Sequence, residues 1–252
     1  DGADIGISVQ TPDKELLDRL GLDMPPKVQS PESTEWIMKA ALACVEKEDP
    51  DFVYCTTNDF VFHHYGPGTP EAKEQIAFAD KYITKIHEID PERQIYITAD
   101  HGMNQKTNLI NFQNMADGKG LHLYCLPPLK DRYVENHIYQ EGGILYIFLE
   151  KDQDPEEFLK LAKETPEIEQ IMTAREAAAA FHLPEDEIGD YVLLAARGCA
   201  FGEVPGERLK TEEVRTHGSL YEREIPLLAI HPQAPSEAYE YSKDIAAFIM
   251  DR

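Results

Sequence analysis

Five side chains of this sequence have the types and the spacing of metal ligands. They are Asp59, His63, Asp100, His101 and His217. Asp59 and His63 are four residues apart, so on a helix they share one face and can hold one ion. Carboxylate and imidazole donors suit zinc, with manganese or iron(II) as alternatives. Two such ions about 3.5–4 Å apart can clamp the attacking and leaving oxygens of a phosphoryl transfer.

Each of these motifs alone has a simpler interpretation. A single Asp-x-x-x-His is usually a helix start with a surface histidine, and a single Asp-His-Gly is usually a turn at a strand end. His217 alone is most often a surface or hydrogen-bonded histidine. All three in this order, after two strand-like runs, favour a metal centre. The remaining histidines lack such a context and are interpreted as structural or exposed: His64, His87, His122, His137, His182 and His231.

The elements that must position these ligands are two short strands and a helix. Residues 52–55 and 95–98 are short runs rich in aromatic and β-branched side chains, which is typical of strands buried on both faces. Residues 70–90 place apolar side chains at three- and four-residue steps and predict an amphipathic helix. A strand, a helix and a strand make a right-handed βαβ unit with parallel strands. Both acid–histidine pairs would then leave the carboxyl edge of one sheet.

The remaining chain predicts further core elements and a small inserted subdomain. Residues 30–50 predict a helix that Ser30 caps, and 103–120 predict a polar loop. Strands alternate with two helices between residues 138 and 202, which suggests an α+β cap placed to act as a lid. The expected fold is an α/β three-layer sandwich with a mainly parallel sheet. Its expected divisions are a core of 1–137, the cap of 138–202, and the core resumed over 203–252.

Composition excludes several classes of partner. The chain has 252 residues, 42% of them hydrophobic, and a formal net charge of −23, which argues against nucleic acid or an anionic membrane as a partner. No apolar run approaches the roughly 18–20 residues that span a bilayer. The four cysteines form no CxxC motif, so free thiols and a reducing, cytoplasmic location are expected.

Three segments together carry a family resemblance. They read TTNDFVFHHYGPGTPEA, YITADHGMNQKTN and RTHGSLYEREIPLLA. In this order they resemble the alkaline phosphatase superfamily, with the phosphonoacetate hydrolases as the most similar members and the nucleotide pyrophosphatase/phosphodiesterases nearby. The recognisable motifs fall between residues 51 and 232.

The resemblance implies a di-zinc hydrolase of a small phosphonate or phosphate ester. One zinc would be held by Asp59, His63 and His217, and the second by Asp100 and His101 with an early Asp and a nucleophilic Thr. That Thr would form a phospho-enzyme that water then releases. In phosphonoacetate hydrolases the C–P bond breaks to give acetate and phosphate, because the leaving carbanion is stabilised as an enolate.

The start of the chain departs from the family pattern. Only 58 residues precede Asp59, where the family has more than about a hundred, and the early Asp and the Thr nucleophile are not found. We therefore interpret the chain as the C-terminal portion of such an enzyme, with unknown catalytic residues. A phosphodiesterase, a metal-dependent phosphomutase and an inactive metal-binding fragment stay open as alternatives. A sheet without its early strands would expose an apolar edge, which favours either aggregation or a homodimer.

Overall fold

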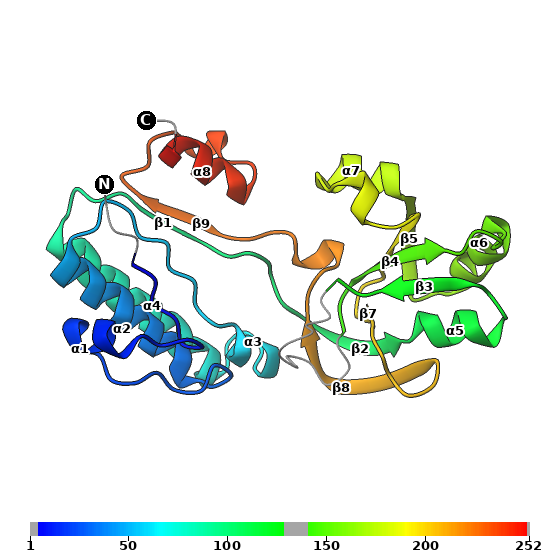
Figure 1. Cartoon of the computed structure of the whole chain (residues 1–252), viewed down its shortest axis with the longest axis horizontal. Helices are drawn as coiled ribbons and strands as arrows, with labels where there is room; N and C mark the ends of the chain where they lie inside the picture. Colours follow the sequence, from blue (N-terminus) through cyan, green and yellow to red (C-terminus); the bar gives the residue numbers. More distant parts are fainter. Residues whose placement is uncertain (1–4, 129–140, 251–252) are drawn as a thin grey trace. The chain divides into compact units, whose positions relative to one another are not determined.

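The computed structural model describes residues 5–128 and 141–250 of the chain (Figure 1). The chain divides into two compact units, one formed by Asp1–Ala99 with Pro226–Arg252 and the other by Asp100–Ile225. The predicted division into 1–137, 138–202 and 203–252 stays a prediction. His137 and the first residues of the predicted cap lie outside the described residues.

The first unit is built mainly from helices that pack on one another. They are α1 (Lys14–Leu20), α2 (Glu32–Glu48), α3 (Phe60–His64), α4 (Pro70–Ile89) and α8 (Ser242–Met250). Met38 and Leu42 of α2 meet the buried Tyr82 of α4. On another side of α2, Trp36 packs against Leu17 of α1. The long helices are therefore held by apolar stripes at helical spacing, as their sequences predict.

A pair of strands lies between helices in this unit. β1 (Ile95–Thr98) and β9 (Leu227–Ile230) pair antiparallel, with Ile95 opposite Ile230. Figure 1 shows α2 and α4 on one side of this pair and α8 on the other. A short 3₁₀ helix, η3 (Ser236–Ala238), precedes α8.

Several predictions for the first unit are wrong. Residues 52–55 do not form a strand, and their side chains are exposed, with Phe52 at 59% and Tyr54 at 81%. The predicted parallel βαβ unit is therefore not formed, because this run has no hydrogen-bonded strand beside it in the described chain. Ser30 does not cap α2 with its side chain, since Pro31 holds the N-cap position and the Ser30 carbonyl accepts the hydroxyl of Ser33. Ile76 of α4 is exposed rather than buried.

The second unit contains two sheets of largely antiparallel strands. The smaller has the order β7 (Cys199–Phe201), β2 (Asn104–Ile110), β8 (Arg208–Thr216). The larger has the order β3 (Leu123–Leu126), β4 (Ile144–Leu149), β6 (Tyr191–Ala195), β5 (Ile168–Thr173). β2 runs parallel to β7, whereas β2–β8 and the pairs of the larger sheet are antiparallel. The mainly parallel sheet expected from the sequence is therefore wrong, and the fold is mixed α/β.

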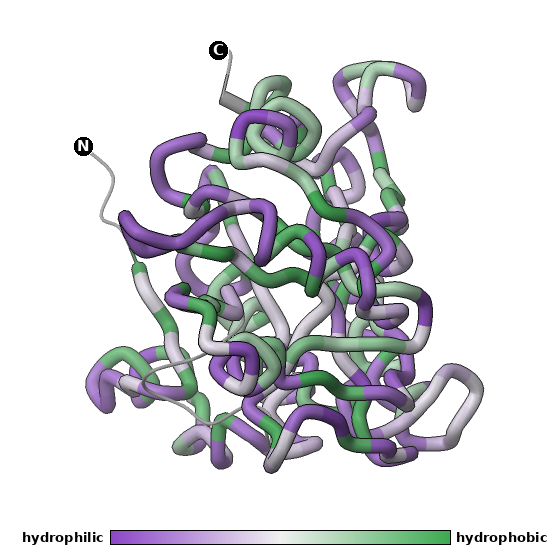
Figure 2. The backbone as a smooth tube through the Cα atoms, turned by 90° about the vertical axis from the view of Figure 1, so that its right-hand side faces the viewer, coloured by the Kyte–Doolittle hydropathy of each residue, from purple (hydrophilic) through white to green (hydrophobic). Residues whose placement is uncertain are grey.

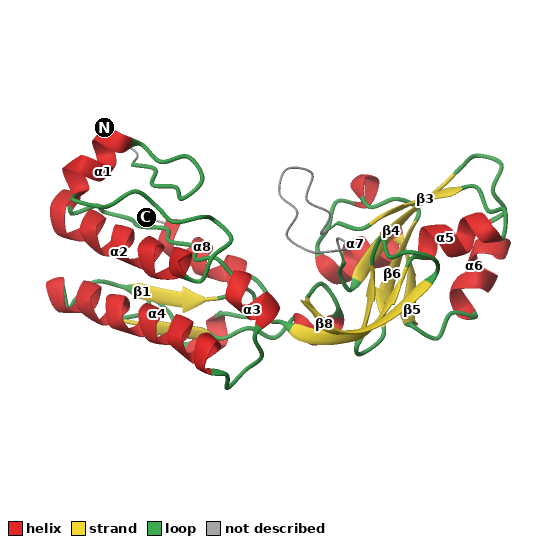
Figure 3. Cartoon of the chain, turned by 90° about the horizontal axis from the view of Figure 1, so that it is seen from below, coloured by secondary structure: helices red, strands yellow, loops and turns green. Residues whose placement is uncertain are grey.

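Successive side chains of a strand point to opposite faces of its sheet, and helices cover both faces of the larger sheet. On one face, Ile147 and Leu193 pack with Phe112 of α5 (Phe112–Gly118) and Phe158 of α6 (Pro155–Lys163). On the other face, Val192 packs with α7 (Ala174–Phe181). Figure 3 shows α5 and α6 beside one side of this sheet and α7 beside the other.

The segment predicted as a polar loop, residues 103–120, forms β2 and α5 instead. Leu109 and Ile110 of β2 and Phe112 of α5 are fully buried, so this polar-looking stretch contributes to the core. Two further 3₁₀ helices, η1 (Glu185–Glu187) and η2 (Leu220–Glu222), complete the unit.

Many of the loops consist of hydrophilic residues, which are purple on the tube of Figure 2. Cys44, Cys55, Cys125 and Cys199 are all free thiols, as expected. Within residues 5–128 and 141–250, none of the helices combines the length and the apolar character that crossing a membrane requires.

Candidate metal centre

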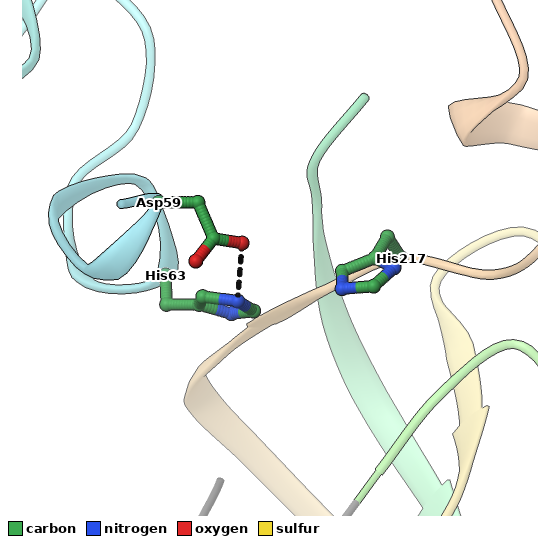
Figure 4. Close-up of side chains that lie close together, drawn as sticks. All are labelled: Asp59, His63 and His217. Atoms are coloured by element: carbon green, nitrogen blue, oxygen red, sulfur yellow. Dashed lines mark ion pairs between the residues drawn. The ribbon is translucent and has the colours of Figure 1, made fainter. Parts of the chain in front are cut away.

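Asp59 and His63 lie at the start of the short helix α3 in the first unit. Asp59 is the N-cap residue, and its side chain makes no capping hydrogen bond to the helix backbone. Its Oδ2 instead lies 3.0 Å from Nε2 of His63, one helical turn later (Figure 4). The predicted shared face is thus confirmed: a carboxylate and an imidazole nitrogen converge at one point, as two ligands of one cation must.

Buried contacts fix the position of α3. Val61, on the opposite face of the helix, is 2% exposed. The side chain of Asn58 accepts the N–H of Phe60 at 2.7 Å, and its backbone carbonyl accepts the hydroxyl of Thr34 from α2 at 3.1 Å. Asn58, the residue just before Asp59, is therefore held by Thr34 on one side and by Phe60 on the other. The Asp59 carboxylate thus projects from a fixed helix start rather than from a free loop.

Asp100 and His101 stand directly after β1, in a tight turn of the second unit. The His101 backbone N–H donates to Oδ1 of Asp100 at 3.0 Å. Nδ1 of the His101 ring lies 2.9 Å from the carbonyl oxygen of Gly102, which can only accept, so Nδ1 carries the proton. That bond leaves Nε2 as the nitrogen able to ligate a metal, which is how metal-binding histidines are commonly oriented.

His217 lies between β8 and η2 and comes into contact with His101. The two imidazole rings are stacked, with centroids 3.4 Å apart and planes 10° from parallel. The backbone carbonyl of His217 accepts the N–H of Gly143 at 2.8 Å, and the hydroxyl of the preceding Thr216 donates to the carbonyl of Glu141 at 3.0 Å. Two histidine-bearing turns far apart in sequence are therefore joined within one unit.

Sequence reasoning missed the residues that support these turns. Lys106 and Glu222 form a buried ion pair behind them, with Nζ and Oε1 2.8 Å apart. Ser219 and Glu222 form a capping box at η2. The spacing S-L-Y-E is a recognisable signature of such a box, whereas nothing in the sequence shows that Lys106 is buried.

A second group of donors in the same unit was not predicted. It consists of His122, Glu150 and Asp152, whose ligand atoms lie within 4.8 Å of one another. All three residues are exposed, and Nδ1 of His122 is 3.4 Å from Oδ2 of Asp152. Exposed groups of this kind are common without a metal, so the turns around Asp59, Asp100 and His217 are the stronger candidates.

The histidines interpreted as structural take varied positions. His64 is exposed at the end of α3, with its ring centroid 4.4 Å from that of Phe60. His182 ends α7 in a left-handed conformation with φ of 58°. His87 and His231 face each other with ring centroids 6.4 Å apart.

A mixed α/β chain with Asp-x-x-x-His, Asp-His-Gly and Thr-His-Gly turns in this order defines a member of the alkaline phosphatase superfamily. Within it, the chain belongs to the type I phosphodiesterase / nucleotide pyrophosphatase family, whose model matches residues 5–220.

Solved structures agree with this assignment. Phosphonoacetate hydrolase from Sinorhizobium meliloti 1021, in complex with phosphonoacetate, is 28% identical with a TM-score of 0.79. Its complex with phosphonoformate gives a TM-score of 0.78. Each match covers 93% of this chain and 58% of that chain, so this chain spans little more than half the length of the hydrolase. Murine ectonucleotide pyrophosphatase / phosphodiesterase 5 is 19% identical with a TM-score of 0.55, covering 81% of this chain and 53% of that one, and it shares the fold.

Proposed function

We propose that this chain carries the metal-binding part of a hydrolase that cleaves phosphonoacetate to acetate and phosphate. The observation that carries the proposal is the likeness to a phosphonoacetate hydrolase whose structure holds phosphonoacetate, at 28% identity over 93% of the chain. The three histidine-bearing motifs all fall within residues 5–220, which the family model matches. In this proposal residues 138–202 form a cap over the substrate.

The donor set fits zinc better than calcium or magnesium, because three of the five proposed ligands are imidazoles. Asp59, His63 and His217 would hold one ion, and Asp100 with His101 would contribute to the second. Manganese or iron(II) are the alternatives for the same donors. When bound, a zinc pair stabilises the negative charge that develops on the transferring phosphoryl group.

The chain's own residues orient these donors. The carbonyl of Gly102 holds the Nδ1 proton of His101, so that Nε2, 3.5 Å from Oδ2 of Asp100, is the nitrogen that can bind a metal. Asp59 forms its ion pair with His63 across one turn of α3, and its side chain makes no capping hydrogen bond to the helix backbone. Ser33 and Thr34, in the first turn of α2, are buried, and their hydroxyls donate to the backbone carbonyls of Ser30 and Asn58. They are therefore structural, and neither is proposed as the nucleophile.

A nucleotide pyrophosphatase/phosphodiesterase is the second candidate, because the family model that matches residues 5–220 carries that description. Both candidates predict the same metal donors and differ in substrate. Phosphate release from phosphonoacetate, compared with hydrolysis of nucleotides and of p-nitrophenyl phosphodiesters, separates them. A chain that binds metal and turns over none of these would be an inactive metal-binding fragment.

The metal site itself is tested by a matched pair of histidine variants on α3. His63→Ala should weaken zinc binding by more than about 100-fold, since losing an outer partner of a ligand alone costs about 10- to 100-fold. His64→Ala, in the next position but exposed, should bind zinc as the wild type does. Affinity is measured by competition with a chromophoric chelator. If the purified protein retains no zinc, manganese or iron, or if both variants bind equally, the proposed site is wrong.

A further inference from the structure

The second unit contains an ion pair that is completely withdrawn from water. Lys106 of β2 is 0% exposed and Glu222 of η2 is 2% exposed. Nζ of Lys106 lies 2.8 Å from Oε1 of Glu222 and 3.2 Å from the hydroxyl of Ser219. Burying two charges is costly, and an apolar pair of the same volume often stabilises a core as well or better. Stability alone therefore gives a weak reason for this pair.

The Glu222 carboxylate is the centre of a closed hydrogen-bond network. Its Oε1 also accepts the side-chain amide of Asn104 at 2.8 Å, and its Oε2 accepts both the backbone N–H and the hydroxyl of Ser219. Burial raises the pKa of Glu222, but hydrogen bonds from Lys106, Ser219 and Asn104 outweigh it, so the pKa lies below its ordinary value. The carboxylate is thus held as a charged acceptor with every partner in place.

This network joins the two turns that carry the histidines. The backbone carbonyl of Glu222 accepts the N–H of Gly102, next to His101, at 2.7 Å. Ser219, which Glu222 binds twice, is two residues after His217. A side chain at position 102 would approach the Glu222 carbonyl oxygen to 3.3 Å, so glycine permits the close contact. Glu222 therefore links the His101 turn to the His217 turn, beyond the end of the β2–β8 pairing where Asn104 stands opposite Thr216, and the two rings are stacked at 3.4 Å.

We propose that Lys106 and Glu222 are positioning residues that hold the two turns together and so present the His101 and His217 rings as a preformed pair of metal donors. The metal part of this inference rests on the proposed function. The arrangement of the rings does not, because it exists within one unit and is measurable without metal. The two claims can therefore fail separately.

The test uses the full chain and the double variant K106M/E222Q. Methionine keeps most of the volume of the lysine stem, and glutamine keeps an oxygen acceptor for Ser219, so the variant removes the charges without leaving one of them unpaired. The matched control is R208M/E167Q, which removes an ion pair in the same unit whose Nε and Oε1 atoms are 2.8 Å apart. Thermal unfolding by circular dichroism confirms that both variants are folded. If K106M/E222Q fails to fold, the apolar pair K106M/E222M takes its place, because it too leaves no buried charge unpaired.

The first measurement is NMR of the histidine ring protons in the metal-free protein. In the wild type and in R208M/E167Q, the ring protons of His101 and His217 should be shifted by the stacked neighbour. In K106M/E222Q they should move toward the positions of unstacked histidines. The second measurement is cobalt(II) titration, in which K106M/E222Q should bind about 10- to 100-fold more weakly with an altered visible spectrum.

The outcomes distinguish this inference from the proposed function. Loss of the ring shifts in K106M/E222Q supports the positioning role, even if neither protein binds cobalt, in which case the metal proposal is the one that fails. Unchanged ring shifts in a folded K106M/E222Q overturn the positioning role, whether or not cobalt binds. Equal changes in R208M/E167Q would also overturn it, because they would reflect a general loosening of the unit.

Discussion

Gly143 lies so close to the turn that carries His217 that a side chain has no room there. A Cβ atom at this position would stand 2.4 Å from both the backbone nitrogen and the Cβ of Ser219. The Gly143 N–H also donates to the His217 carbonyl at 2.8 Å. Gly143→Ala should therefore displace the His217 turn and destabilise the protein by about 1–3 kcal/mol, the usual cost of overpacking.

The control for this prediction is Gly118→Ala at the end of α5. A Cβ there meets Oε1 of Glu207 at 3.6 Å, which is an ordinary contact, and alanine favours a helix over glycine. Urea unfolding should show a loss of stability for Gly143→Ala and no loss for Gly118→Ala. Equal stability of the two variants would contradict the steric conflict that we infer for a side chain at position 143.

The ion pair between Glu167 and Arg208 gives a prediction for acid stability. A hydrogen bond from Arg208 at 2.8 Å holds the pKa of Glu167 below its ordinary value of 4.5, against the effect of burial. Because the folded pKa is lowered, this pair stabilises the protein above about pH 4.5 and the contribution is lost as the pH falls through the folded pKa.

Glu167→Gln should remove that dependence. Since the Arg208 side chain is 44% exposed, solvent screens the pair and the loss at neutral pH should be about 0.2–1 kcal/mol. Unfolding free energies measured between pH 7 and pH 3 should differ between the two proteins at neutral pH and converge in acid. A difference that instead grows in acid would contradict the assignment.

At the scale of the element, the start of α7 depends on a reciprocal cap. The Thr173 hydroxyl accepts the backbone N–H of Glu176, and the Glu176 carboxylate accepts the backbone N–H of Thr173 at 2.8 Å. Thr173→Ala should destabilise the protein by about 1 kcal/mol, because the backbone N–H of Glu176 loses its acceptor. Arg175→Ala, exposed in the same turn, should change the unfolding free energy by less than about 0.5 kcal/mol in chemical denaturation. Similar losses in both variants would indicate a propensity effect rather than a cap.

Helices were predicted better than strands, for a physical reason. A helix satisfies its own backbone, so apolar spacing within the segment predicts α2 and α4 from sequence alone. A strand needs a partner that the sequence does not reveal. The run 52–55 has the composition of a buried strand but no hydrogen-bonded neighbour among the described residues, whereas the polar β2 is a strand because β7 and β8 flank it.

The same contrast between local and distant contacts applies to the site: the sequence predicts ligands that local spacing brings together, and it misses the residues that support them from other elements. Asp59 and His63 were found because a spacing of four places them on one helical face, and the 3.0 Å contact confirms it. The stacking of His101 on His217 joins turns more than a hundred residues apart and was not predicted, since the family resemblance only assigned the two histidines to neighbouring ions. The burial of Lys106 could not be foreseen, because its charge is compensated by Glu222 from another element.

For the whole molecule, the proposed function gives one ion three ligands from distant parts of the sequence: Asp59, His63 and His217. The single tryptophan, Trp36, gives a signal specific to the first unit, where its ring nitrogen donates to the carbonyl of Asp23 at 3.0 Å. Zinc at a hundred times its dissociation constant should stabilise the folded state by about 2.7 kcal/mol, because it binds the folded chain alone. The thermal transition of Trp36 fluorescence should therefore move upward with zinc.

His217→Ala should abolish most of that shift, since the proposed ion would lose one of its three ligands. His182→Asn is the control, because His182 lies in the second unit outside the proposed ligand set and asparagine tolerates its left-handed backbone. It should leave the zinc-dependent shift of Trp36 unchanged. If His217→Ala keeps the full shift while His63→Ala loses it, then Asp59 and His63 bind zinc without His217. The three-ligand site, and with it the proposal of a di-zinc hydrolase, would have to be abandoned.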